Sequence, residues 1–152
     1  MVVIAHSGAN GYMIEPMAKS TTPGVTVLLT QLTKVIYRRT SEDQLGMRLK
    51  EFATLAMLHD HSPIPQHELG ELMCVDANNL VLLLNDLEAR EFAVRRRDPA
   101  DRRRHLVEIT EEGLRAFASA EKAIEGVEDD VLALLTRNER VELQGLLSKA
   151  LD

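Results

Sequence analysis

Six arginines stand within ten residues, between positions 95 and 104, in the segment VRRRDPADRRRHLVEIT (94–110). Two Arg triplets flank a turn that contains Pro and Asp, although the whole chain carries a formal net charge of −6. The guanidinium group of Arg is always charged and planar, so it suits contacts with phosphate groups. This cluster in an acidic chain therefore predicts a local site where an anionic partner, such as a nucleic-acid backbone, binds.

The composition limits what kind of protein carries this cluster. A chain of 152 residues, with 45% hydrophobic but only 3% aromatic residues, predicts one mainly helical domain with an aliphatic core. The single cysteine, Cys74, excludes an intrachain disulfide and fits a reducing cytoplasm. No apolar stretch approaches the roughly 20 residues of a membrane span, so we expect a cytoplasmic protein with no membrane partner.

The elements before the arginines predict a helix-turn-helix. Apolar residues at helical spacing indicate helices over about 25–40 and 47–60, and the prolines of SPIP end the second. A short helix over about 66–73 and a longer one that begins at the N-cap Asp76 follow, with a turn near Cys74 between them. In the longer helix the predicted buried stripe is Leu80, Leu83, Leu84 and Leu87.

The arginines themselves lie in a predicted β-hairpin. FAVRRR and HLVEI both read as short strands, and the polar DPADRR joins them. A hairpin that follows a helix-turn-helix makes a winged helix, here over about 47–109. We therefore predict a mainly α fold with a small β-hairpin, in which a winged helix-turn-helix is joined to a helical dimerisation region.

Two further helices complete the chain. Thr110 caps a helix from Glu111 to about 134, and the capping box TRNE at 136–139 starts the last one. Residues 1–24 show no clear period, so we expect an N-terminal arm or flexible tail followed by one domain over 25–152.

The order of elements and the wing residues resemble the MarR family of bacterial transcription regulators. The residues that carry the resemblance are Asp101 and Arg103, an Asp-x-Arg pair, followed by Ile109, Thr110 and Gly113. The resemblance extends from about Val25 to the C-terminus. It implies a homodimer formed by helices of about 25–40 and 111–151, with each winged helix in a major groove of palindromic double-stranded DNA.

The resemblance also implies roles for the wing residues. Asp101 is expected to accept hydrogen bonds from Arg103 and to orient it, and either Arg102 or Arg103 is expected to enter the minor groove. The complete set of expected DNA contacts is Asn78, Asn79, Val81, Leu82, Arg95, Arg96, Arg97, Arg102, Arg103 and Arg104.

The predicted recognition helix carries no Arg or Lys before Arg90. Asn binds adenine in a bidentate manner and an apolar side chain contacts the thymine methyl group. We therefore predict an A/T-leaning site that is read by Asn78 or Asn79, with Val81 or Leu82 in support. The alternative is that the Asn side chains only cap the helix. Glu91 stands where the resemblance leads us to expect a left-handed Gly, so either the turn differs or the protein tolerates strain there.

Other candidate sites carry less weight. Ligands of the family are often small phenolic or aromatic anions, but the spacing of Tyr37, Arg38 and His59 selects none, so the ligand-binding residues stay open. His59, His61 and His67 lack the partners of a zinc site, so we expect no metal and no cofactor. Cys74, flanked by Met73 and Val75, is more typical of a buried hydrophobe than of a redox sensor.

No catalytic motif is present in the sequence, so we do not expect an enzyme. We expect a homodimeric regulator that acts as a repressor. It binds an inverted repeat, and a small ligand can release it from the DNA. The alternative is a winged helix that binds proteins and has no specific DNA site.

Overall fold

A computed structural model of the chain describes residues 23–151, and the expected arm over residues 1–24 lies outside this range except for its last two residues. The elements are α1 (Val25–Arg39), α2 (Glu42–Leu45), α3 (Leu49–His61), β1 (Ile64–Pro65), α4 (Gln66–Leu72), α5 (Ala77–Ala89), β2 (Ala93–Arg97), β3 (His105–Ile109), α6 (Glu111–Val131) and α7 (Arg137–Leu151). The predicted helices and both predicted strands are present. Helix α2 and strand β1 were not predicted.

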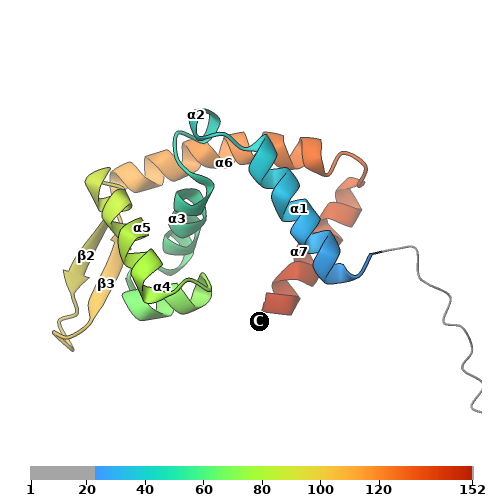
Figure 1. The fold of residues 1–152 in the computed structure, drawn as a ribbon. Helices are drawn as coiled ribbons and strands as arrows, with labels where there is room; N and C mark the ends of the chain where they lie inside the picture. The colour runs from blue at the N-terminus through green and yellow to red at the C-terminus, as the bar shows by residue number, and fades with distance from the viewer. Residues whose placement is uncertain (1–22, 152) are drawn as a thin grey trace, which may run out of the picture.

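The long helix α6 connects two parts of the molecule (Figure 1). Near its N-terminal end it lies above α3, α5 and the β-hairpin, which form the winged helix. Helices α1 and α7 hang from its C-terminal half, well apart from the wing. Since α2 and α3 also pack against α6, this helix fixes the winged helix relative to the α1–α7 pair.

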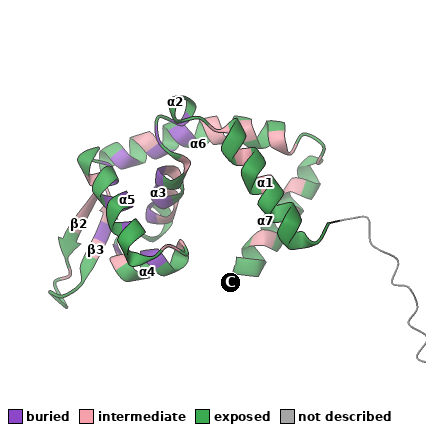
Figure 2. Ribbon diagram, viewed as in Figure 1, coloured by how far each residue is buried: buried purple, intermediate pink, exposed green. Residues whose placement is uncertain are grey.

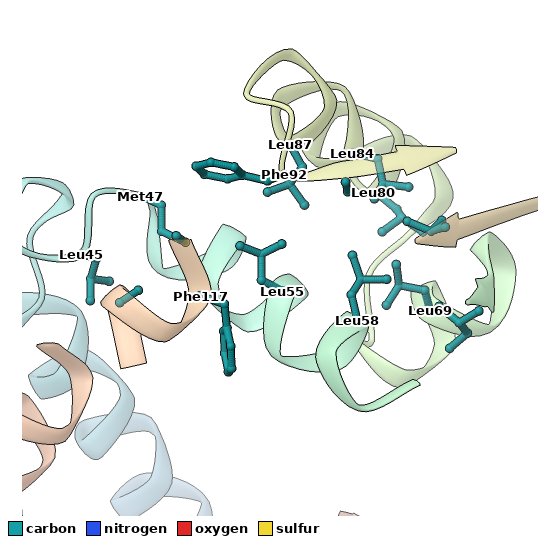
Figure 3. Packing of buried hydrophobic residues seen from close by; sticks show 14 residues of the cluster. Leu45, Met47, Leu55, Leu58, Leu69, Leu80, Leu84, Leu87, Phe92 and Phe117 are labelled. Carbon is teal, nitrogen blue, oxygen red and sulfur yellow. The ribbon is translucent and has the colours of Figure 1, made fainter. Parts of the chain in front are cut away.

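The core of the winged helix is aliphatic, as the composition predicts. Leu55 and Leu58 of α3, Leu69 of α4 and Leu84 of α5 are fully buried and converge in one cluster (Figure 3). The predicted stripe of α5 is confirmed, because all four of its leucines are buried. Buried residues concentrate in this part of the molecule, whereas α1 and α7 contain none (Figure 2).

The hairpin is part of a three-stranded antiparallel sheet with the order β1-β3-β2. Arg97 faces His105 and Ala93 faces Ile109 across β2 and β3, while Ile64 of β1 pairs with Val107. From the sequence, the SPIP segment was expected only to end the preceding helix, and no strand was predicted there. A two-residue strand is too short to show a period. It forms only because β3, whose residues lie more than 40 positions further along the chain, packs beside it in the fold.

Local capping positions the recognition helix and its neighbours as predicted. Asp76 accepts hydrogen bonds from the backbone N–H groups of Asn78 (3.1 Å) and Asn79 (3.0 Å). The Thr110 hydroxyl accepts one from the Gly113 N–H (2.9 Å), and Thr136 exchanges hydrogen bonds with Glu139. Each contact satisfies a backbone amide that the first turn of a helix leaves unpaired.

Glu91 is left-handed, with a φ of 59°, so of the two alternatives the turn keeps the conformation typical of Gly and the protein tolerates the strain. It ends α5 in a Schellman motif: the Phe92 N–H donates to the Leu87 carbonyl and the Glu91 N–H to the Glu88 carbonyl, both at 2.9 Å. The Thr110 hydroxyl also donates to the Glu91 carbonyl. These bonds offset the steric cost of a non-glycine residue in this conformation.

Candidate nucleic-acid interface

The two aspartates of the wing shape its turn. Asp98 Oδ1 accepts the Ala100 N–H at 2.8 Å, and Asp101 Oδ1 accepts the Arg103 N–H at 3.0 Å. Both contacts join a side chain to the backbone two residues on, which is the Asx-turn geometry. The Asp98 N–H donates to the Arg104 carbonyl at 3.1 Å and closes the loop. The Asp residues thus build the support from which the arginines project.

Asp101 contacts its neighbours in a different way from the expected one. Its carboxylate binds the backbone of Arg103 rather than the guanidinium, and its other oxygen lies 3.6 Å from Nε of Arg104. Within the wing it therefore orients the peptide that carries Arg103. The side chain of Arg103 stays exposed.

The six arginines divide into paired and unpaired groups. Arg96 lies 3.3 Å from Glu108 on the neighbouring strand, and Arg104 faces Asp101. Arg95 contacts α5, as described below. Of these six arginines, Arg97, Arg102 and Arg103 form no ion pair with any residue in 23–151, and all three are exposed. These three have guanidinium groups available for an external anion.

Arg95 joins the wing to the recognition helix. Its backbone N–H donates to Glu88 Oε1 at 2.8 Å and its Nε donates to Glu88 Oε2 at 3.0 Å, while Nη2 also reaches Asn85. The guanidinium lowers the pKa of the Glu88 carboxyl below its ordinary value. The sequence analysis placed Arg95 among the DNA contacts, whereas in the structure its side chain is turned towards α5.

The exposed residues of α5 form two stripes. Asn79, Leu82 and Asp86 line a cavity of about 760 Å³ between this helix, α3 and the end of α1. Asn78, Val81 and Asn85 are exposed and do not line it, and Asn85 is bound by the wing residue Arg95. Because residues at i, i+3 and i+7 share a helix face, Asn78 and Val81 lie on the wing side of α5.

The Asn side chains differ in their partners. The Asn79 amide donates to Asp76, which fits the capping alternative for that residue. The Asn78 side chain makes no hydrogen bond within the part of the chain that the structure describes, and it is exposed. Of the two predicted readers, Asn78 is thus the one with a free amide.

A groove of about 770 Å³ runs between the helix-turn-helix and the wing. Arg103, Arg104 and His105 line it from the wing, and Gln66 and His67 line it from the start of α4. The sequence analysis missed the contributions of Gln66, His67 and His105. Nothing in the sequence around these three residues indicated a shared site, because the groove forms only when α4 and β3 are brought together in the fold.

Cys74 also lines this groove and is exposed, so the expectation of a buried cysteine is wrong. Its φ of 51° places it in the tight turn between α4 and α5, where the side chain points away from the core. The left-handed turn, rather than the hydrophobic neighbours in sequence, decides its exposure.

The histidines considered for metal binding do not converge. His59 stacks on Phe117 with ring centroids 5.1 Å apart and contacts Asp60. Among residues 23–151 there is no group of three or more His, Cys, Asp or Glu side chains that could hold a metal ion. Over the same residues, no helix combines the length and apolar character needed to cross a membrane.

Comparison with known proteins places the chain among transcription regulators. The model of the MarR family matches residues 47–105, which cover the winged helix. The transcriptional repressor NicR of Pseudomonas putida is 33% identical over 67% of this chain, and the match spans 65% of NicR, just under two thirds of its length. A putative regulatory protein for the hcr operon of Thauera aromatica is 31% identical over 74% of this chain and 68% of its own.

A solved structure supports the same assignment. The transcriptional repressor CouR bound to a 23-mer DNA duplex superposes with a TM-score of 0.70 and 25% identity, over 84% of this chain and 89% of CouR. The winged helix-turn-helix fold predicted from the sequence is thereby confirmed.

Proposed function

The chain belongs to the MarR family of transcriptional regulators, and on that premise we propose that it is a homodimeric repressor of an inverted-repeat operator. The relatives are transcriptional regulators, which confirms the prediction that the protein is not an enzyme. The observation that carries the proposal is the trio Arg97, Arg102 and Arg103 on the wing, which has no ion pair within residues 23–151. Arg103 also lines the groove beside the start of α5.

The unpaired arginines support a division of labour on DNA. Arg102 or Arg103 at the tip of the wing enters the minor groove, and Arg97 contacts the phosphates beside it. Asn78, with Val81 next to it, reads A/T base pairs in the major groove. Arg96 and Arg104 add positive charge that is partly offset by Glu108 and Asp101. Because DNA is the target, the protein acts in the cytoplasm.

The exposed apolar residues of the outer helices support the homodimer. Val25 on α1 is 72% exposed, Val141 on α7 is 64% exposed, and Leu134 between α6 and α7 is 99% exposed. Neither α1 nor α7 has a buried residue in the single chain (Figure 2). A second copy that covers these helices would remove the apolar surface from water and would set the spacing of the two winged helices.

The cavity of about 760 Å³ supports a small-molecule effector. Its walls combine Tyr37 of α1, Lys50 of α3 and the apolar Leu82 of α5, together with the paired Arg48 and Asp86 and with Glu42, and its size suits a small ligand. Lys50 has no ion pair within residues 23–151, so this cation beside an aromatic ring favours a small aromatic anion. Arg38 and His59, considered with Tyr37 from the sequence, do not line it.

Fluorescence anisotropy with the DNA that flanks the protein's own gene, or with DNA selected from a random pool, tests the proposal. We expect tight binding that falls steeply with salt and collapses for Arg103→Ala. Arg115→Ala is the matched control, because Arg115 is an exposed arginine on α6 that pairs with Glu112 away from the wing. Weak binding without sequence preference that Arg103→Ala leaves unchanged would favour a protein-interaction module instead.

The effector is tested in the same assay with two probes of equal shape. Benzoate is expected to release the DNA and neutral benzamide is not, because only the first offers a carboxylate to Lys50. Equal effects of both probes would contradict an anion site in this cavity.

A further inference from the structure

A buried carboxylate lies at the start of α3. Glu51 is 3% exposed, and its oxygens accept hydrogen bonds from the Arg48 N–H and from Arg48 Nη2, both at 2.8 Å. Nη1 of Arg90 lies 3.2 Å from the same carboxylate. A charge removed from water in this way is stable only when it is paired and fully hydrogen-bonded, and two guanidinium groups provide that here.

The two arginines also connect this carboxylate to the second half of the recognition helix. Arg48 Nη2 pairs with Asp86 on α5, and Arg90 is the C-cap residue of α5. Arg90 also donates to the Gly46 carbonyl and lies over the Phe92 ring, 4.4 Å from its centroid. The first turn of α3 thus holds α5 at Asp86 and again at Arg90, one helical turn later.

The ion pair with Arg48 also neutralises the negative charge of Asp86 on the recognition helix. Asp86 is half-exposed on a helix that is expected to meet DNA, where an acidic side chain repels phosphates. In the structure, Asp86 is turned towards Arg48 rather than left free. Hydrogen bonds to Glu51 and then to Asp86 raise the pKa of the Arg48 guanidinium above its ordinary value.

We propose that Arg48 is a positioning residue that fixes the recognition helix for specific DNA binding, by holding Asp86 of α5 on the buried anchor Glu51. This inference rests on the proposed DNA-binding function. A planar guanidinium can hold two carboxylates at once, which a single ammonium group holds with less directional control. Without the pair, α5 keeps its hydrophobic packing but loses the polar contact that sets its angle to α3.

Asp86→Asn separates this role from simple electrostatics, because the two predict changes of opposite sign. Loss of a negative charge near DNA should tighten binding to any sequence. Loss of the positioning contact should weaken binding to the selected operator by about fivefold, while binding to unrelated DNA stays equal or becomes tighter. Asp43→Asn on α2 is the matched control, since Asp43 is exposed and forms no ion pair within residues 23–151.

Two further variants and one measurement without DNA complete the test. Arg48→Met should weaken operator binding at least as much as Asp86→Asn, because it also leaves the Asp86 carboxylate free to repel phosphate, and the double variant should bind no more weakly than Arg48→Met. In the free protein, hydrogen exchange of the α5 amides should be faster in Asp86→Asn, whereas exchange of α6 should be unchanged.

Each outcome bears on a separate claim. If the wild type binds no operator, the proposed function fails, and unchanged α5 exchange in Asp86→Asn then overturns the positioning role independently. If the wild type binds and Asp86→Asn binds equally or more tightly to operator, Arg48 does not position the helix. Weaker operator binding in Asp86→Asn together with faster α5 exchange would support the role.

Discussion

Replacement of Arg95 and of Arg97 by Ala should separate stability from DNA contact. Both are strand residues of the same cluster, two positions apart, so the change in charge is identical. Arg95 has a side chain that is 21% exposed and donates several hydrogen bonds to Glu88 and Asn85. Arg97 is exposed and lies at the end of β2.

The magnitude follows from these contacts. A charge-assisted hydrogen bond contributes about 1.5–3 kcal/mol when shielded and less than 1 kcal/mol at the surface. Since Glu88 is itself 30% exposed and keeps the bond from the Arg95 backbone, we expect Arg95→Ala to lower the free energy of unfolding by about 1–2 kcal/mol. Arg97→Ala should change it by less than about 0.5 kcal/mol.

For DNA binding the order should be reversed, with a larger effect of Arg97→Ala than of Arg95→Ala. Each phosphate contact contributes about 0.9 to the slope of log affinity against log salt, so a fourfold rise in salt costs about 3.5-fold in affinity per contact. Arg97→Ala should reduce the slope of log affinity against log salt by about 0.9, and Arg95→Ala should leave this slope unchanged.

Urea unfolding and anisotropy titrations at 50 and 200 mM salt measure the two quantities on the same samples. A reduced salt slope with unchanged stability in Arg95→Ala would refute the assignment, because it would mean that Arg95 leaves Glu88 and contacts phosphate.

Four further predictions concern other parts of the chain. Because the folded-state pKa of Glu88 lies below its ordinary 4.5, its pair with Arg95 should stabilise the protein above about pH 4.5 and lose this effect as the pH falls through the lowered value; urea midpoints against pH should show this in the wild type and to a smaller extent in Arg95→Ala, which keeps only the backbone hydrogen bond. Gly113→Ala should cost about 3 kcal/mol or more in urea unfolding, since an added Cβ would lie 2.0 Å from the Phe92 carbonyl oxygen; a cost below about 1 kcal/mol would contradict this packing. Val141→Glu should yield a monomer by light scattering, and a dimer of unchanged stability would exclude α7 from the interface. The exposed Cys74 should react fully with a thiol reagent in the folded protein, which slow reaction limited by unfolding would contradict.

The order of the helices and their start points could be predicted from the sequence because the forces that set them are local. Asp76, Thr110 and Thr136 cap backbone amides two or three residues ahead, so the capping partner is visible in the same stretch of sequence. The leucines of α5 recur at helical spacing, which already identifies the buried face. The conformation of Glu91 stayed open in the sequence, because a Glu after the helix allows either a different turn or a strained left-handed one.

The positions of the arginines in the sequence established that an anionic partner is expected at the wing, but not which of them are free. Arg95 finds Glu88 across a helix end, and Arg96 finds Glu108 on the next strand. These pairings require the register of β2 on β3 and the packing of β2 on α5. A uniform set of six contacts was therefore the most that the sequence could indicate.

The contacts between distant segments were decided only by the tertiary structure. Arg48 and Asp86 are 38 residues apart, Arg90 and Glu51 are 39 apart, and β1 pairs with a strand beyond the recognition helix. No period or spacing in the sequence links such residues, because the pattern around each of them reports only its own helix and not the helix that packs against it. Burial of the leucine core brings α3 against α5, and only then does a charged residue such as Glu51 require its two guanidinium partners.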